Sequence, residues 1–232
     1  ILLVTMFAIQ SVIALANLTG HFLSFSLAGS EVVYLVTALL LSTWRYSQSK
    51  EPAEKLFFLV FTPSLLLFSL VKISQVFLIE FVTPLILDFG YFCSYLLLVA
   101  SLRVKPDKPL LTDDLFVVSS PKNLSALVFI LGFFGYLVLI PSQLSNESYE
   151  TRNPSIGFYL LINIYVFISL LQKLQTVDSQ QWRLTFSYIL FAVFILIAGD
   201  LATFINSNYN LVVLSKELIS VIDSGALILV CF

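Results

Sequence analysis

The chain has 232 residues, of which 59% are hydrophobic and 11% are charged, and its formal net charge is -2. Soluble domains contain about 45–50% apolar and about 25% charged residues, so this composition excludes a soluble globular domain. Disorder requires low hydrophobicity with high net charge, and a nucleic-acid footprint requires a basic excess, so both are excluded. The composition is typical of a polytopic α-helical membrane protein.

Few residues are suited to disulfide or metal chemistry. Cys93 and Cys231 lie inside apolar runs and are too few for a disulfide framework. The single histidine, His21, cannot form a zinc site alone, and we place it in an outer loop. We therefore expect neither a metal site nor a cofactor.

The apolar residues fall into eight segments, each close to the roughly 20 residues that a helix needs to cross a membrane. Gly20 and several prolines mark the breaks, and Pro63 and Pro84 fall inside the third and fourth segments, where neighbouring helices tolerate a kink. We predict one all-α domain, a polytopic membrane bundle of eight transmembrane helices over residues 1–232. The predicted helices cover residues 1–19, 30–45, 56–79, 81–102, 124–141, 155–176, 184–205 and 211–232.

Basic residues are concentrated in alternate loops. Nine of them follow the second, fourth and sixth predicted helices, whereas the opposite loops contain Arg152. By the positive-inside rule, this asymmetry predicts that both termini of the multi-pass chain lie in the cytoplasm, with the protein in the inner cell membrane. The nine residues are Arg45, Lys50, Lys55, Arg103, Lys105, Lys108, Lys122, Lys173 and Arg183.

Two pairs of similar short motifs raise the question of an internal repeat. Trp44-Arg45 precedes the third predicted helix, and Trp182-Arg183 precedes the seventh. Asp88-Phe89-Gly90 is similar to Asp223-Ser224-Gly225. A duplication into two four-helix halves explains both pairs, and so does chance in an apolar sequence of low complexity.

Charged residues within the predicted helices are the main functional signal, because a charge at the bilayer centre costs about 2.5–3.5 kcal/mol unless it faces a cavity or a partner. Depth along each helix places them in the outer half of the membrane or near its midplane. Spacing groups them into stripes, since residues three, four and seven apart share a helix face. The charged residues are Glu31, Lys72, Asp88, Asp200, Lys216, Glu217 and Asp223.

We predict that these stripes surround a polar pocket that opens outward. The pocket would be lined by Lys72, Gln75, Asp88, Tyr91, Asn163, Asp200, Lys216, Ser220 and Asp223.

Three interpretations of this cluster stay open. In the first interpretation, Lys72 pairs with Asp88 or Asp200 and holds the helices together, without any chemistry. In the second interpretation, the cluster binds a ligand. The third interpretation is a catalytic site, in which Asp200 is the ionised group near Lys72, Asp223 is the proton donor and Asp88 is the third carboxylate.

The apolar run over residues 190–205, which ends in Gly199-Asp200-Leu-Ala-Thr-Phe-Ile, resembles the penultimate helix of the YhhN-like lysoplasmalogenase family. Residues 66–71, Leu-Leu-Phe-Ser-Leu-Val, resemble its third helix, in which Phe-Ser-Leu precedes Gly-Asp. The resemblance covers the whole chain and implies an eight-helix fold. Members of that family cleave the vinyl-ether bond of lysoplasmalogens, and the acids of helices three and seven are the suspected catalytic residues.

The chain departs from that family at Lys72-Ile73, where the family has Gly-Asp. Two acids are able to act as acid and base on an enol ether, whereas a lysine beside one aspartate holds it ionised. The resemblance therefore implies a divergent, inactive member that binds a lipid-like or small amphiphilic ligand, with membrane lipid as its partner.

Trp182-Arg183, Gly199-Asp200 and Asp88-Phe-Gly-Tyr91 also resemble recurring pairs in multi-helix input domains of bacterial signalling proteins. That resemblance implies an alternative function. The protein would be a membrane sensory input domain or an accessory subunit, with a protein partner in the membrane and no nucleic acid.

Overall fold

The computed structural model describes residues 21–77, 84–108 and 154–209, together with positions 132, 135, 219, 221, 222 and 226. Five long helices account for nearly all of these residues, so the predicted all-α class is confirmed for them. The first, fifth and eighth predicted helices lie almost entirely outside the described residues. The five helices are α2 (His21–Gln48), α3 (Pro52–Phe77), α4 (Pro84–Arg103), α8 (Pro154–Thr176) and α9 (Gln180–Tyr209).

Four of the described helices are long and apolar enough to cross a membrane. No more than 39% of the residues in any of these windows are buried inside the protein. Large apolar side chains such as those of Leu59, Ile86 and Phe191 are more than half exposed. An apolar surface of this extent is typical of helices that face lipid. The four spans are Pro52–Gln75, Ile86–Arg103, Gly157–Thr176 and Gln180–Asn206.

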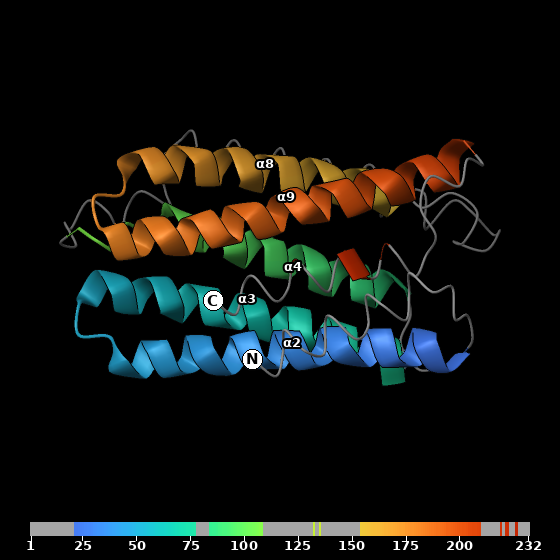
Figure 1. Cartoon of the computed structure of the whole chain (residues 1–232), viewed down its shortest axis with the longest axis horizontal. Helices are drawn as coiled ribbons and strands as arrows, with labels where there is room; N and C mark the ends of the chain where they lie inside the picture. The colour runs from blue at the N-terminus through green and yellow to red at the C-terminus, as the bar shows by residue number, and fades with distance from the viewer. Residues whose placement is uncertain are drawn as a thin grey trace.

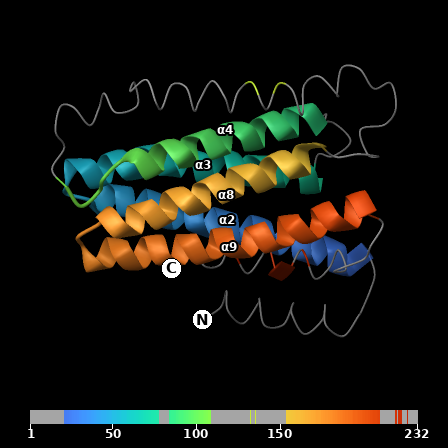
Figure 2. The ribbon, with the colours of Figure 1, turned by 90° about the horizontal axis from the view of Figure 1, so that it is seen from above.

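Consecutive helices run in opposite directions, except that α4 and α8 run in the same direction, and each packs against the next (Figures 1 and 2). α2 packs against α3, α3 against α4, α4 against α8, and α8 against α9. The ends of α2, α4 and α8 and the starts of α3 and α9 therefore meet at one end of the bundle, on the left in Figure 1. We call it the basic end, because eight basic residues lie there. They are Arg45, Lys50, Lys55, Arg103, Lys105, Lys108, Lys173 and Arg183.

The second predicted helix is wrong in its bounds, because α2 runs over 28 residues from His21 rather than from 30 to 45. His21 is thus the first residue of a helix and not part of a loop. One glycine, Gly29, costs a helix only about 1 kcal/mol, and no proline interrupts residues 21–48. α2 is not among the described helices that are apolar enough to span a membrane.

Prolines mark where several helices begin. Pro52 is the first residue of α3, where its missing N–H is not needed. The carbonyl of Glu51 accepts the Lys55 N–H at 3.0 Å and closes the first turn. Pro63 lies inside α3, as predicted. Pro84, predicted inside a helix, is instead the first residue of α4, and residues 81–83 lie outside the described part of the chain.

An aromatic cluster made of Phe57, Phe58, Phe61, Trp182 and Phe186 joins α3 to α9 near the basic end. The ring centroid of Phe57 lies 5.1 Å from that of Trp182 and 5.8 Å from that of Phe186. Aromatic pairs contribute about 0.5–1.5 kcal/mol each beyond the area they bury. The cluster therefore fixes α9 against the α2–α3 pair.

The two Trp-Arg dipeptides do not occupy equivalent positions. Trp44 lies near the end of α2 and is 55% exposed, whereas Trp182 lies in the first turn of α9 and is 9% exposed. Copies of one ancestral unit would place the dipeptide at the same point of a helix. Of the two explanations, duplication and chance, this pair therefore gives duplication no structural support.

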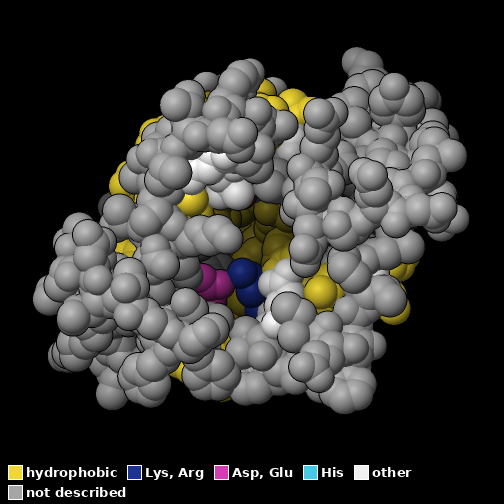
Figure 3. Space-filling model, turned by 90° about the vertical axis from the view of Figure 1, so that its right-hand side faces the viewer, with side chains coloured by type: hydrophobic (Ala, Val, Ile, Leu, Met, Phe, Trp, Pro, Cys, Tyr) yellow, Lys and Arg dark blue, Asp and Glu magenta, His cyan; other side chains and the backbone are white. Residues whose placement is uncertain are grey.

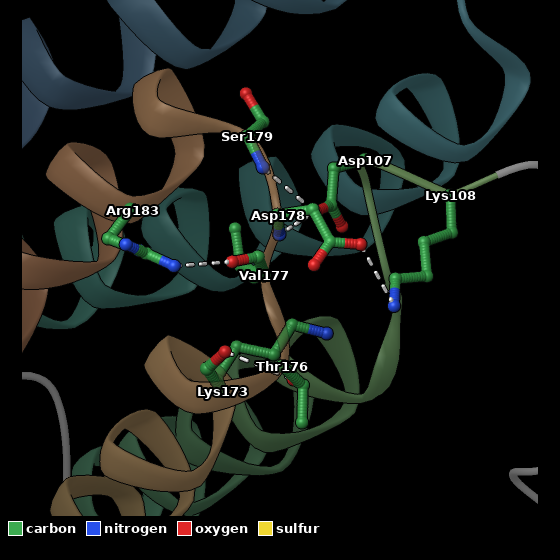
Figure 4. A network of polar contacts seen from close by, with 8 residues as sticks. All are labelled: Asp107, Lys108, Lys173, Thr176, Val177, Asp178, Ser179 and Arg183. Carbon is green, nitrogen blue, oxygen red and sulfur yellow. Dashed lines mark hydrogen bonds and ion pairs between the residues drawn. The ribbon is translucent and has the colours of Figure 1, made fainter.

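Polar contacts at the basic end tie the segment after α4 to the turn between α8 and α9 (Figure 4). Asp107 Oδ2 accepts hydrogen bonds from the backbone N–H of Asp178 at 2.7 Å and of Ser179 at 3.4 Å. Lys173 Nζ donates to the carbonyl of Val104. Because N–H groups at the start of a helix lack partners within it, Asp107 caps α9 from a distant segment.

We expect Asp107→Ala to lower the free energy of unfolding by about 1–2 kcal/mol, because the carboxylate cap of α9 is lost. Asp178→Ala is the control, since the side chain of Asp178 is 82% exposed and its ion pair with Lys108 lies at the surface. It should cost less than about 1 kcal/mol. Thermal unfolding of the detergent-purified chain measures both, and equal losses would contradict the capping role.

Candidate functional site

A cavity of about 340 Å³ lies among the five described helices. Figure 3 looks at the end of the bundle opposite the basic end and shows a hollow in which basic and acidic side chains lie beside hydrophobic ones. Its volume lies within the range of about 300–1,000 Å³ that is typical of small-molecule sites. A second cavity of about 150 Å³ lies nearer the basic end, and Ala38, Phe61 and Ile189 line both.

The polar lining residues gather toward the end opposite the basic end. On α3, Lys72 lies further from the basic end than Phe61, and on α9 Asp200 lies further from it than Ile189. We call this region the polar compartment. It consists of Glu31, Lys72, Gln75, Asp88, Tyr91, Tyr159, Asn163 and Asp200.

The deeper lining is hydrophobic, and we call it the apolar compartment. At about 1.5 Å per residue, the segment of α3 from Phe61 to Lys72 is about 16 Å long. This length is close to half of a hydrocarbon core about 30 Å thick. The cavity is therefore polar at one end and mainly apolar along the rest, which also contains Tyr95 and Ser64, whose hydroxyl donates to the Ser94 carbonyl at 2.8 Å. The apolar compartment consists of Leu35, Ala38, Phe61, Leu65, Phe68, Leu98, Ile189, Ala192, Val193 and Leu196.

Lys72 forms an ion pair with Glu31. Its Nζ atom lies 2.8 Å from Glu31 Oε2, and the two side chains are 28% and 6% exposed. The sequence predicted Asp88 or Asp200 within direct or water-bridged reach of Lys72, whereas the partner in this pair comes from α2, the helix packed against α3. Lys72 also interacts electrostatically with the Asp200 carboxylate on the opposite wall.

Asn163 and Asp200 join α8 to α9. Asn163 Nδ2 donates a hydrogen bond of 2.6 Å to Asp200 Oδ2. Asn163 is 2% exposed, and its Oδ1 atom has no hydrogen-bond partner within the described residues. A buried acceptor without a partner is costly, so this oxygen is suited to receive a donor from a water or a ligand.

Two further contacts involve tyrosines. Tyr159 Oη donates to the Asp88 carbonyl at 2.9 Å and lies 3.3 Å from Asp88 Oδ1, which joins α8 to α4. Tyr91 Oη donates to Gln75 Oε1 at 2.8 Å, which joins α4 to α3. With the ion pair and the Asn163–Asp200 bond, one polar contact of the compartment crosses each of the four packed helix interfaces.

The structure brings most of the predicted site residues together. Six of them lie among the described residues, and all six line the cavity. The other three, Lys216, Ser220 and Asp223, lie outside the described residues. Among the described residues, no group of three or more His, Cys, Asp and Glu side chains is placed to hold a metal ion. The six are Lys72, Gln75, Asp88, Tyr91, Asn163 and Asp200.

Two residues of the site were missing from the sequence prediction. Glu31 was recognised as a charge within a helix but not as a pocket residue, because the predicted helix began beside it. Tyr159 lies four residues before Asn163 and so shares its face of α8. That spacing is a signal that Tyr159 belongs to the pocket, although tyrosine is common in this chain and carries no charge.

Lys72→Met should lower the free energy of unfolding by about 2–3 kcal/mol, because it leaves the Glu31 carboxylate buried without its ion-pair partner. Loss of one partner of a fully buried pair costs about 3–5 kcal/mol, and Lys72 is partly exposed. The double variant Lys72→Met, Glu31→Leu should recover at least half of the loss. Equilibrium unfolding in mixed micelles measures all variants, with Lys108→Met as a surface control. A double variant no more stable than Lys72→Met would argue against the pair.

Comparison of the chain with protein family models, curated proteins and solved structures gave no match. The resemblance of residues 190–205 to the lysoplasmalogenase family therefore stays a prediction. The resemblance places a Gly-Asp pair where this chain has Lys72-Ile73, and Lys72 is paired with Glu31.

Proposed function

We propose that this chain is an integral membrane protein that binds a lipid-like or small amphiphilic molecule in the cavity among α2, α3, α4, α8 and α9. The observation that carries the proposal is the separation of the polar compartment from the apolar compartment along the bundle axis. A lipid in a bilayer has the same order, with its polar head near the surface and its tail toward the midplane. A single tail fits the length of the apolar lining, which covers about one leaflet.

We further propose that the basic end faces the cytoplasm, with both termini on the same side, in the inner cell membrane. The grouping of eight basic residues at one end of the described bundle supports this orientation. The hollow seen in Figure 3 then opens outward. A ligand would enter from the outer leaflet or from the space outside it.

We propose binding without hydrolysis. Cleavage of an enol ether needs a proton donor and a base that activates water. Where the resemblance to the lysoplasmalogenases places a Gly-Asp pair with one of two acids, this chain has Lys72-Ile73, and Lys72 forms an ion pair with Glu31. We therefore propose a lysoplasmalogenase-like pocket without the helix-three acid of that family. Release of a fatty aldehyde from a lysoplasmalogen by the purified protein, abolished by Asp200→Asn, would contradict this inference.

Filling the apolar compartment should abolish binding of an amphiphile. Ala192 is buried on α9 and lines the cavity, whereas Ala198 is exposed on the same helix. We expect Ala192→Phe to weaken binding of a fluorescent single-chain amphiphile by at least about tenfold, or about 1.4 kcal/mol.

Ala198→Phe is the matched control and should leave the affinity unchanged. Thermal unfolding of both variants shows whether Ala192→Phe remains folded, since overpacking costs about 1–3 kcal/mol. A folded Ala192→Phe protein with unchanged affinity would overturn the proposed site.

The orientation is tested by labelling of single cysteines in a chain whose native cysteines, Cys93 and Cys231, are replaced by serine. Cysteines in place of Lys50 and Asp178, two exposed positions at the basic end, should react with an impermeant reagent only from the cytoplasmic side. A cysteine in place of Ser145 should react from the outside. Labelling of all three from one side would contradict the orientation.

A further inference from the structure

We propose that the polar head of the ligand carries a positive charge, in the form of a protonated primary amine. This inference rests on the proposed function of amphiphile binding and adds the charge and the hydrogen-bonding character of the head. Three features of the polar compartment support it: its charge balance, its hydrogen-bond acceptors and its aromatic rings.

The charge balance of the described lining is acidic. It contains one lysine and three carboxylates, and the lysine forms an ion pair with one of them, Glu31, at 2.8 Å. Asp88 and Asp200 add two formal negative charges on α4 and α9. Because a cavity wall within a membrane screens charge less than water does, an anionic head would be repelled and a cationic head attracted.

The hydrogen-bonding groups of the lining favour a donor on the ligand. Asn163 Nδ2 already donates to Asp200, and the buried Oδ1 of the same amide has no partner within the described residues. The hydroxyl proton of Tyr159 is directed at Asp88, so its oxygen is able only to accept. A primary ammonium offers three N–H donors, whereas a quaternary ammonium offers none and a carboxylate adds acceptors.

Aromatic rings complete the compartment. The rings of Tyr91 and Tyr159 lie edge to face with centroids 5.9 Å apart, and Tyr95 stacks on Tyr159 at 5.8 Å. Cations are attracted to the faces of such rings, and the attraction grows when water is excluded. Tyr159 thus combines a ring that favours a cation with a hydroxyl bound to an acidic residue.

The test compares four amphiphiles that share a twelve-carbon tail: dodecylamine, dodecyltrimethylammonium, dodecanol and dodecanoate. Each displaces a neutral fluorescent amphiphile from the full chain in a neutral detergent at pH 7, where the amine is protonated. We expect dodecylamine to bind at least about tenfold more tightly than dodecanol, with dodecanoate the weakest. Dodecyltrimethylammonium should lie between dodecylamine and dodecanol.

Asp200→Asn should reduce the preference for dodecylamine over dodecanol to about threefold or less, while the affinity for dodecanol stays the same. Asp178→Asn makes the same chemical change at the exposed basic end and should leave the preference intact. The probes partition into the detergent to the same extent with every variant. A change in the preference for dodecylamine over dodecanol therefore arises at the binding site. If Asp200→Asn does not fold, Asp88→Asn provides the same comparison.

Equal or tighter binding of dodecanoate would overturn the positive charge of the head. Equal binding of dodecyltrimethylammonium and dodecylamine would overturn the primary amine. A preference for dodecylamine that survives both Asp200→Asn and Asp88→Asn would overturn the role of the carboxylates. Binding of none of the four amphiphiles would instead refute the proposed function itself, and with it this inference.

Discussion

Polar side chains inside membrane-spanning helices have no water to bind, so they must find partners on neighbouring helices or face a cavity. In this protein they do both. Lys72–Glu31, Gln75–Tyr91, Asp88–Tyr159 and Asn163–Asp200 each cross a different packed interface, from α2 to α9 in chain order. Interhelical hydrogen bonds in membranes are worth about 0.6–2 kcal/mol each, so these contacts position the helices as well as stabilise them.

The same contacts explain why a cavity persists at their centre. Side chains that reach sideways to an adjacent helix do not fill the middle of the bundle, and the residues below them on α9 include the small Ala192. Toward the basic end, the aromatic cluster around Phe57 brings α3 and α9 together. Phe61, toward the basic end, lines both this cavity and the second one, whereas the charged groups of the cavity lie at the other end.

The ion pair of Lys72 connects this architecture to function. The Lys72–Glu31 pair uses the one lysine of the polar compartment, and the other carboxylates, Asp88 and Asp200, outnumber the remaining basic groups of the described lining. In the proposed function, this lining holds the polar head of the ligand. The apolar compartment beneath it offers a hydrophobic surface to the hydrocarbon tail of the proposed ligand.

The sequence by itself determined the all-α class, the four apolar spans and the shared helix face of Asp88 and Tyr91, because hydrophobic length and helical spacing are local properties. The sequence also predicted six of the residues that line the cavity, since the depth of a polar residue in the membrane follows from the number of residues between it and the helix end. The tertiary structure alone decided that Lys72 pairs with Glu31, because the choice among several carboxylates at similar depth depends on which helices pack together. It likewise decided that α2 begins at His21, because neither the isolated Gly29 nor the polar residues of this segment interrupt a helix that packs along α3.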